Sequence, residues 1–258
     1  MLAIERKNEI LAKLRAEQRV LVSELSAHYG VTEETIRRDL DKLEKEGYAT
    51  KTYGGAIWGN STKADLSYTI RNKTNVEAKR AIALEAAAII EDGDHIMLDD
   101  SSTSLYIAKQ IKEKKNLTVI TNSVEIIVEL ASVEGWTIMS TGGTLKPDSL
   151  ALVGHQAQET LRNYHVDKAF ISCKGADRNN GVTDSSESHS LNKQAMLRSA
   201  RQTFLCLDGS KFDKTSFVKI TDFPALAAVV TNRKPDAAWQ NFFRELQIPC
   251  YSPVRDVG

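Results

Sequence analysis

Apolar residues recur every three or four positions in the first part of the chain, which is the spacing of amphipathic helices. Three such segments are present, and Gly30 and Gly47 follow the second and the third of them. Glycine often stands just beyond a helix because it readily takes the left-handed conformation there. The pattern predicts helices over residues 5–16, 22–29 and 33–46.

The second and third predicted helices are separated by a short turn that contains Gly30, which is typical of a helix-turn-helix. Thr32 is suited to begin the third helix, because its hydroxyl can accept a hydrogen bond from a free amide of the first turn. The outward face of this helix offers a hydroxyl and two guanidinium groups, which can bind phosphates and guanine edges in a DNA major groove. That face consists of Glu34, Thr35, Arg37, Arg38, Asp41 and Lys45.

Two strand-like segments, YATKT and AIW, flank the pair Gly54-Gly55 and predict a β-hairpin, or wing, after the third helix. Lys51 and Tyr53 would lie near the tip of this wing. We therefore expect a winged helix-turn-helix over residues 3–58 that binds DNA through the helix face and the wing. This segment holds ten Lys or Arg and ten Asp or Glu, so a plain three-helix domain with solvated charges is the alternative.

The polar stretch over residues 59–75 predicts a hinge between two domains, although an ordered connector fits it equally well. Over residues 76–258, strand-like apolar runs alternate with helical ones, for example over 76–90 and 191–200. Such alternation indicates a mostly parallel β-sheet covered by helices, so we expect a second domain of the α/β class. The strand-like runs are HIMLDD, LTVIT, WTIMST, DKAFISC, TFLCLD and ALAAVVTN.

Ligands of parallel α/β folds gather at the carboxyl ends of strands, and polar loops follow five of these runs, including a loop over residues 174–177. Hydroxyls beside free amides at a helix start can cradle an anion, glycines let a ligand approach the backbone, and lysines can pair with phosphate. Ordinary helix capping is the alternative for each loop taken alone. The candidate residues are Asp100, Ser101, Ser102, Thr103, Ser104, Thr121, Asn122, Ser123, Gly142, Gly143, Lys174, Gly175, Asp208, Ser210 and Lys211.

Composition narrows the classes of function. Lys plus Arg and Asp plus Glu both number 34, so any binding to DNA depends on the local placement of cations. Three separated cysteines argue against a disulfide framework, and five histidines without ligand spacing predict no metal. No dinucleotide or ATP motif occurs, so no cofactor is expected. No apolar run approaches the length of a membrane span, about 20 residues, and we expect a cytoplasmic protein that does not enter membranes.

The string VTEETIRRDLDKLEKEGYATKTYGGA, residues 31–56, resembles the DNA-binding signature of the DeoR family of bacterial transcription regulators. It departs from the family pattern at Lys51, where arginine is usual, and at Tyr53, where histidine is usual. Lysine keeps the charge but lacks the two-pronged guanidinium. The segments LDDSSTSLYIA, LTVITNS, STGGTL, DKAFIS, GVTDS and LDGSKF likewise occur in the order of the DeoR sensor domain.

This resemblance implies a sensor domain similar in fold to ribose-5-phosphate isomerase, with a phosphorylated sugar or polyol as its effector. It implies phosphate contacts from Ser101–Ser104 and Lys211, and sugar-hydroxyl contacts from Asp100, Asn122, Asp184 and Asp208. The family often has glutamate four residues before Lys193, where this chain has His189. The far end of the pocket would therefore suit a different sugar.

The hypothesis that follows is a repressor of a carbohydrate-catabolism operon that a phosphorylated sugar releases from its operator. Specific sites in duplex DNA are usually read as paired half-sites, so we expect a homodimer or tetramer. Activation by the effector is one alternative. A sugar-phosphate isomerase with a DNA-binding appendage is another, but no isomerase motif is recognisable around the candidate bases, and we expect no enzymatic activity. These bases are Asp177, Asp184, Glu187 and Asp208.

Overall fold

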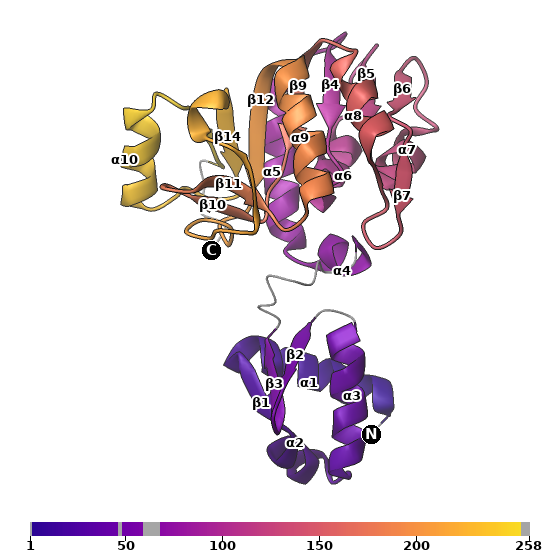
Figure 1. Cartoon of the computed structure of the whole chain (residues 1–258), viewed down its shortest axis with the longest axis vertical. Coiled ribbons are helices and arrows are strands. Elements are labelled where there is room, and N and C mark those ends of the chain that lie inside the picture. The colour runs from indigo at the N-terminus through magenta and orange to yellow at the C-terminus, as the bar shows by residue number, and fades with distance from the viewer. Residues whose placement is uncertain (1, 46–47, 59–67, 254–258) are drawn as a thin grey trace. The chain divides into compact units, whose positions relative to one another are not determined.

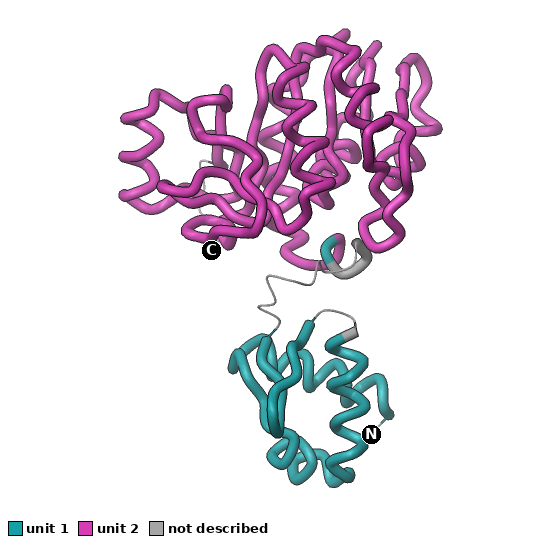
Figure 2. The backbone as a smooth tube through the Cα atoms, viewed as in Figure 1, with its two compact units in different colours: residues 1–71 teal, residues 72–258 magenta. Residues whose placement is uncertain are grey.

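The computed structural model of the chain describes residues 2–45, 48–58 and 68–253. The chain divides into two compact units, residues 1–71 and 72–258, which Figure 2 shows in different colours. Residues 59–67 of the predicted hinge, and Gly47, lie outside the described residues. The rest of the predicted hinge includes a short helix, α4 (Tyr68–Lys73), which the sequence pattern does not predict.

The first unit contains three helices and a three-stranded antiparallel sheet with the strand order β1-β3-β2. The second helix has the predicted bounds, and the hairpin β2–β3 is the predicted wing, whereas β1 was not predicted. The elements are α1 (Ala3–Glu17), β1 (Arg19–Leu21), α2 (Val22–Tyr29), α3 (Glu33–Lys45), β2 (Ala49–Thr52) and β3 (Gly55–Trp58).

Apolar side chains from all three helices and the sheet form the core of this unit. Ile36, Leu40 and Leu43, the predicted stripe of α3, are buried there. One ion pair crosses the same interior: Arg6 Nε of α1 lies 2.7 Å from Asp39 Oδ2 of α3, and both side chains are almost wholly buried. This packing fixes the inner side of α3, so its outer side faces solvent.

The second unit is built on a seven-stranded sheet in which every strand pair is parallel, as predicted. Its strands are β4 (His95–Leu98), β5 (Thr118–Thr121), β6 (Thr137–Ser140), β9 (Val166–Ile171), β12 (Ala200–Leu207), β14 (Ala228–Thr231) and β15 (Cys250–Tyr251). The helices are α5 (Val76–Ile89), α6 (Ser102–Gln110), α7 (Val124–Leu130), α8 (His155–Arg162), α9 (Glu187–Ser199) and α10 (Ala237–Glu245), with one 3-10 turn at Phe223–Ala225. In Figure 1, α8 and α9 lie in front of the sheet and α5 and α6 behind it.

The strand order β15-β14-β12-β9-β4-β5-β6 reverses direction between β4 and β9. From β4 the chain proceeds outward through β5 and β6, and then returns to pair β9 with the other side of β4. Open parallel sheets bind ligands at such a reversal, outside the carboxyl ends of the strands. A ligand site is therefore expected at the loops after β4, β5 and β9.

Two smaller sheets stand beside this edge. The hairpin of β7 (Thr144–Lys146) and β8 (Ala151–Val153) is one, and β10 (Gly175–Asp177), β11 (Gly181–Asp184) and β13 (Val218–Thr221) form the other. The prediction of a loop over residues 174–177 is therefore wrong, because most of this segment is β10. Its short glycine-containing strand has no apolar alternation to reveal it, although Ala176 pairs with Val182 inside the core.

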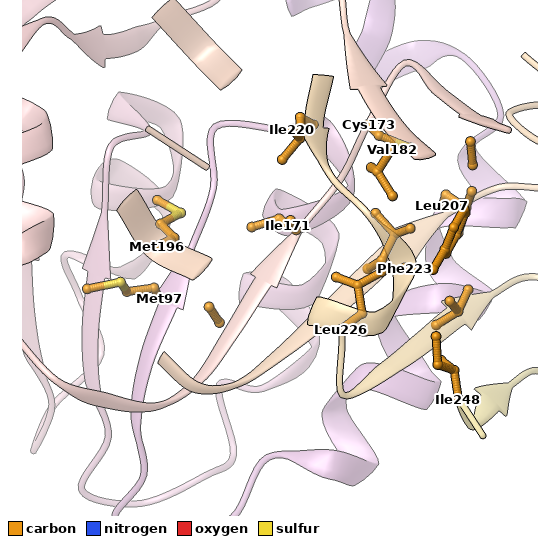
Figure 3. Packing of buried hydrophobic residues seen from close by; sticks show 14 of the residues in the cluster. Met97, Ile171, Cys173, Val182, Met196, Leu207, Ile220, Phe223, Leu226 and Ile248 are labelled. Atoms are coloured by element: carbon orange, nitrogen blue, oxygen red, sulfur yellow. The ribbon is translucent and has the colours of Figure 1, made fainter. Parts of the chain in front are cut away.

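The core of the second unit joins the large sheet to α8, α9 and α10 (Figure 3). Met97 of β4, Ile171 of β9 and Met196 of α9 belong to the same buried cluster. Because these side chains belong to one buried cluster, the packing holds α9 against the ends of β4 and β9. These are the elements that carry the polar residues described next.

Candidate DNA-binding surface and effector site

The start of α3 has the cap that its sequence predicts. The amide of Thr35 donates to Thr32 Oγ1 over 3.3 Å, and the two threonine hydroxyls lie 2.9 Å apart. Capping by a hydroxyl satisfies one of the amides left free at a helix start. The helix therefore begins where a helix-turn-helix requires.

Both arginines of α3 project into solvent, and each forms an ion pair on its own helix. Arg37 Nη2 lies 2.8 Å from Glu33 Oε2, and Arg38 Nε lies 3.3 Å from Glu34 Oε1. The Arg38 side chain is 74% exposed. Exposed pairs of this spacing contribute little to stability, so these guanidinium groups can exchange carboxylate for phosphate.

The wing presents Lys51 and Tyr53. The Lys51 ammonium pairs with Asp41 of α3, and this hydrogen bond raises the pKa of Lys51 above its ordinary value. Tyr53 is fully exposed at the hairpin tip, beside Gly54 in a positive-φ conformation. Gly55 is buried in β3, where an added Cβ would lie 2.2 Å from the carbonyl oxygen of Val20, so it has a packing role and is not part of the exposed surface.

In the second unit, Asp99 and Asp100 follow β4 at the reversal of strand order, and both are buried. Asp99 holds the edge together: its Oδ2 accepts from the amide of Ser172 after β9, 2.8 Å away. Its Oδ1 accepts from the amide of Ser101 and, over 2.6 Å, from the hydroxyl of Ser104. Asp99 is therefore occupied by structural bonds, whereas Asp100 faces other side chains.

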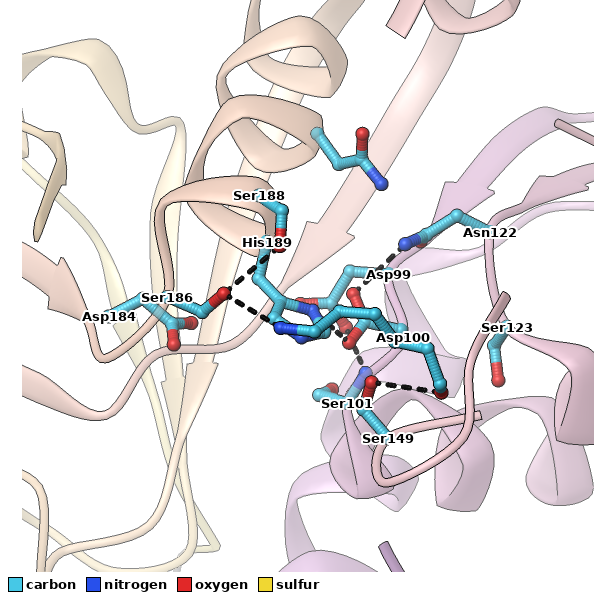
Figure 4. Close-up of polar contacts among 12 residues, drawn as sticks. Asp99, Asp100, Ser101, Asn122, Ser123, Ser149, Asp184, Ser186, Ser188 and His189 are labelled. Carbon is cyan, nitrogen blue, oxygen red and sulfur yellow. Dashed lines mark hydrogen bonds and ion pairs between the residues drawn. The ribbon is translucent and has the colours of Figure 1, made fainter. Parts of the chain in front are cut away.

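Asp100 meets a histidine and an asparagine (Figure 4). Its Oδ2 lies 2.7 Å from Nδ1 of His189 on α9, and its Oδ1 accepts from Nδ2 of Asn122 over 3.0 Å. Burial alone would raise the pKa of Asp100, but His189, Lys193 and Asn122 together hold it well below its ordinary range. The carboxylate is therefore ionised in the folded protein.

Lys193, one turn after His189 on α9, is a buried cation between carboxylates. Its Nζ pairs with Asp184 at the end of β11 and lies 3.6 Å from Asp99 Oδ2. Burial would lower the pKa of Lys193, but the carboxylates of Asp184, Asp99 and Asp100 raise it above its ordinary value. The same contact keeps the pKa of Asp184 low despite burial. We call these five residues the buried charge cluster: Asp99, Asp100, Asp184, His189 and Lys193.

The serine-rich loop at the start of α6 uses part of its polar groups internally. Ser101 Oγ accepts from the amide of Ser104 over 3.0 Å and donates to the hydroxyl of the same residue. Ser102 and Thr103 are buried and lie in the first turn of α6, where backbone amides have no partner within the helix. Ser101 and Ser104 are thus capping residues, and Ser102 and Thr103 retain the groups that could bind an anion.

At the end of β5, the side chains of Thr121 and Ser123 also form hydrogen bonds with the backbone. Thr121 Oγ1 donates to the carbonyl of Leu98 over 2.7 Å, and Ser123 caps α7 by accepting from the amide of Ile126. Asn122 between them is buried and directed toward Asp100, as Figure 4 shows. Of the three predicted residues in this loop, Asn122 is the one that reaches the buried charge cluster.

The loop after β12 is closed on itself. Asp208 accepts from the amide and the hydroxyl of Ser210, and from Asn75 Nδ2 over 3.4 Å. Lys211 is half-buried, and its charge acts on Cys173, two residues after β9, as does that of Lys193. Lys211 therefore lies near the same edge of the sheet, whereas the carboxylate of Asp208 is used by its own loop.

The remaining predicted residues have other contacts. Gly142 and Gly143 have positive φ, and a Cβ on Gly143 would lie 2.6 Å from the carbonyl oxygen of Val153. A Cβ on Gly175 would lie 2.3 Å from the carbonyl oxygen of Lys214. The charge of Lys174 acts on Asp184. Close backbone packing therefore accounts for the last two of these glycines.

Profiles of two protein domains match most of the chain. The profile of the DeoR C terminal sensor domain matches residues 74–233, and that of the DeoR-like helix-turn-helix domain matches residues 6–62. The chain belongs to the DeoR family. An HTH-type transcriptional regulator of Bacillus subtilis (strain 168), YulB, is 41% identical over 92% of this chain and 92% of its own length.

A putative aga operon transcriptional repressor of Escherichia coli O157:H7 is 33% identical, over 88% of this chain and 86% of its own length. This DeoR-family chain is accordingly a DNA-binding transcription regulator, and such relatives give the isomerase alternative no support. A solved structure, ribose 5-phosphate isomerase A of Methanocaldococcus jannaschii, is 19% identical with a TM-score of 0.40, covering 54% of this chain and 55% of that chain. A likeness at this level says nothing about shared chemistry. None of the helices in the described part of the chain is long and apolar enough to cross a membrane.

Sequence reasoning missed several residues that this DeoR-type sensor brings together. They are Lys146, Ser172 and Asn192. Asp99 lies in the predicted run HIMLDD, and the resemblance placed His189 and Lys193 near the far end of the pocket, but none of these three was predicted as a ligand-binding residue. Lys146 comes from the β7–β8 hairpin and donates to Ser186 Oγ, before α9, over 3.3 Å. The sequence alone gives no signal for α9, because polar residues at positions 189, 190, 192 and 193 suggest an exposed face, whereas the structure buries all four. Burial of several polar side chains on one helix indicates a polar site, because an apolar core would not offer them hydrogen-bond partners.

Proposed function

We propose that the chain is a repressor of a carbohydrate-catabolism operon and that a phosphorylated sugar releases it from operator DNA. The observation that carries this proposal is the gathering of Asn122 and the buried charge cluster at the strand-order reversal of a DeoR sensor domain. Carboxylates and amides are suited to bind sugar hydroxyls. A cytoplasmic protein is part of the proposal, because operator DNA is there.

The phosphate of the effector would bind at the start of α6. Free amides and the helix dipole favour an anion at such a position, and the hydroxyls of Ser102 and Thr103 lie in the same turn. Lys211 would add a positive charge from the loop after β12, which is separated from β4 in the sheet by β9. Asp100, Asn122 and Asp184 would then face the hydroxyl groups.

Operator binding would use the exposed side of α3 and the wing. We assign phosphate and base contacts to Thr32, Glu34, Thr35, Arg37 and Arg38, and wing contacts to Lys51, Tyr53 and Gly54. The ion pairs of Arg37 and Arg38 with neighbouring glutamates are weak enough to be exchanged for DNA phosphates. A single helix reads a short half-site, so a homodimer or tetramer is proposed to bind the full operator.

The DNA contacts are tested by replacing Arg37 and Arg38 together with alanine. Specific binding to genomic fragments selected by the wild-type protein should be lost, and the salt slope of residual binding should fall by roughly one for each lost phosphate contact. Arg15→Ala, at an exposed arginine of α1, is the matched control and should bind as the wild type does. Retained specific binding by the double variant would contradict the assignment.

The effector site is tested by thermal shift with a panel of sugar phosphates, because a ligand of the native state raises the melting temperature. Lys211→Ala should weaken binding by about 1.5–3 kcal/mol if the lysine pairs with phosphate. Ser102→Asp should abolish the shift by charge repulsion, whereas Ser102→Ala should reduce it only moderately. A normal response of Ser102→Asp would place the phosphate elsewhere.

A further inference from the structure

We propose that Asn122 and Asn192 form an acceptor pair that selects effectors with two neighbouring hydrogen-bond donors at the end remote from the phosphate. The donors would be two hydroxyls, or a hydroxyl and an amino group. This inference rests on the proposed function and adds the chemical class of the effector's other end. It begins from two side-chain oxygens that the structure buries without a donor.

The two asparagines come from different elements but share one partner. Asn122 Nδ2, after β5, donates to the carbonyl oxygen of Leu152 over 3.3 Å, and Asn192 Nδ2, on α9, donates to the same oxygen over 2.9 Å. Both side chains are fully buried. The two amide groups are therefore neighbours around a single carbonyl of β8.

Their orientation is fixed by these bonds. Asn122 uses both of its N–H groups, one on Leu152 and one on Asp100 Oδ1, 3.0 Å away. Turning either amide over would place its oxygen against the Leu152 carbonyl, where two acceptors repel. The Oδ1 atoms must therefore point away from that carbonyl.

Neither Oδ1 atom has a hydrogen-bond donor among the residues that the structure describes, and both are buried. Buried polar atoms in folded proteins are almost always paired, so each of these oxygens calls for a partner from outside the chain. Because the oxygens require donors, a hydroxyl or an amine fits them and a phosphate does not.

The surrounding charges strengthen this assignment. Asp100 accepts a hydrogen bond from Asn122, and Lys193 contacts both Asp99 and Asp184. The carboxylates of this cluster already hold Lys193 and His189 as partners, so neither cation is left for a phosphate, whereas the first turn of α6 attracts one. The effector would therefore bind with its phosphate at Ser102 and Thr103 and its donor-rich end at the asparagine pair.

Asn192→Leu provides a variant that separates recognition from structure. Leucine has a similar shape, and the Leu152 carbonyl keeps its bond from Asn122 in this variant. Removing a buried acceptor that has no donor should leave the melting temperature of the free protein unchanged or higher. A purely structural asparagine would instead lower it. Asn192→Ala serves as a second variant if the leucine form does not fold.

The probes are glucose 6-phosphate, glucosamine 6-phosphate, 2-deoxyglucose 6-phosphate and inorganic phosphate, titrated against the full chain by calorimetry. Wild-type protein should bind glucose 6-phosphate or glucosamine 6-phosphate at least about tenfold more tightly than the deoxy compound, because a site built for a hydroxyl rejects its absence. If glucose 6-phosphate binds more tightly than glucosamine 6-phosphate, the second donor is a hydroxyl; if glucosamine 6-phosphate binds more tightly, it is an amine. In Asn192→Leu this ratio should fall toward one, while Asn241→Leu, at an exposed asparagine of α10, should leave it unchanged.

The outcomes separate this inference from the proposed function. Equal binding of the deoxy compound by wild-type protein, or an unchanged ratio in Asn192→Leu, overturns the acceptor pair and leaves sugar-phosphate sensing intact. Binding of inorganic phosphate but of none of the three sugar phosphates contradicts the acceptor pair and gives sugar-phosphate sensing no support. If none of the four compounds binds, the acceptor pair is contradicted, and sensing of a sugar phosphate is contradicted only if the wider thermal-shift panel also gives no shift.

Discussion

Two groups of charged residues in this protein contain the same kinds of partner in opposite surroundings. On α3, Arg38 and Glu34 form a pair whose side chains are 74% and 64% exposed. In the sensor, Lys193 and Asp184 form a pair whose side chains are 5% and 3% exposed. Solvent screens the first pair strongly and the buried second pair much less, so the same attraction has different consequences.

The difference matches what each region has to do. Exposed pairs contribute about 0–1 kcal/mol, so the arginines of α3 can leave their glutamates for DNA phosphates at little cost. A buried cation cannot be left without its carboxylates, so Lys193 holds β4, β11 and α9 in one arrangement. The DNA-binding surface is thus made of exchangeable partners, and the effector site of fixed ones.

Among the charged residues of these two groups, Lys193 should have the largest effect on stability when it is replaced. Lys193→Met leaves Asp99 and Asp184 buried without their cation, and we expect the free energy of unfolding of the sensor to fall by about 3–5 kcal/mol. Urea denaturation of the full chain, followed by far-ultraviolet circular dichroism, measures this change. The structure predicts a much larger effect here than at any lysine on the surface.

Lys112→Met is the matched control. Lys112 Nζ lies 2.5 Å from Glu129 Oε1, and its side chain is 35% exposed. Loss of this half-exposed pair should cost at most about 1 kcal/mol. Similar losses in the two variants would show that burial does not distinguish the two kinds of ion pair.

Acid should destabilise the sensor by protonating carboxylates of the buried charge cluster. The pKa values of Asp100 and Asp184 are lower in the folded protein than their ordinary values, so the unfolded chain binds more protons near pH 4. Their contribution to stability is present above the unfolded pKa, about 4, and is lost as pH falls below it. The raised pKa of Lys193 has the opposite sense, and its contribution is lost only as pH rises above about 10.4.

Asp184→Asn should therefore flatten the acid side of the stability curve. Between pH 5 and 3, each pH unit should cost the variant up to about 1.4 kcal/mol less than it costs the wild type, because one fewer carboxylate takes up a proton. Glu113→Gln, at an exposed glutamate, is the control. Parallel acid limbs for wild type and Asp184→Asn would contradict a lowered pKa at this residue.

Sequence patterns predicted the fold because each element shows its own periodicity. The bounds of α2 and the buried stripe of α3 could be read directly, and alternation of apolar runs predicted the parallel sheet. The hairpin β7–β8 and the sheet of β10, β11 and β13 were not predicted, because strands of three or four residues that contain glycine or charged residues show no clear hydrophobic period.

The site was predicted in part for a related reason. Loops at strand ends marked Asp100 and Asn122, since chain order is enough to place them at one edge. His189, Asn192 and Lys193 come from the inner face of a helix, and only the packing of α9 over β9 and β12 brings them to that edge. Spacing along the chain could not reveal whether Ser101 and Ser104 bind a ligand or cap α6; the structure gives them the capping bonds.

The smallest expected effect on stability comes from the exposed ion pairs of α3. Glu33→Gln removes the partner of Arg37 at the start of α3, where a negative charge also interacts with the helix dipole. We expect the free energy of unfolding to fall by at most about 1 kcal/mol. Operator DNA should bind about threefold more tightly at low salt, because a carboxylate near 6 Å from a phosphate repels it by about 0.7 kcal/mol in water.

Fluorescence anisotropy with labelled operator fragments measures this gain, and it should shrink as salt is raised. Glu125→Gln, in α7 of the sensor, removes the same charge far along the chain and should leave DNA binding unchanged. The gain in affinity and the small loss in stability must occur together, since both follow from an exchangeable pair at the surface. Weaker DNA binding by Glu33→Gln would mean that the glutamate orients Arg37 for the DNA, and the exposed pair would then be a fixed element like Lys193 and Asp184.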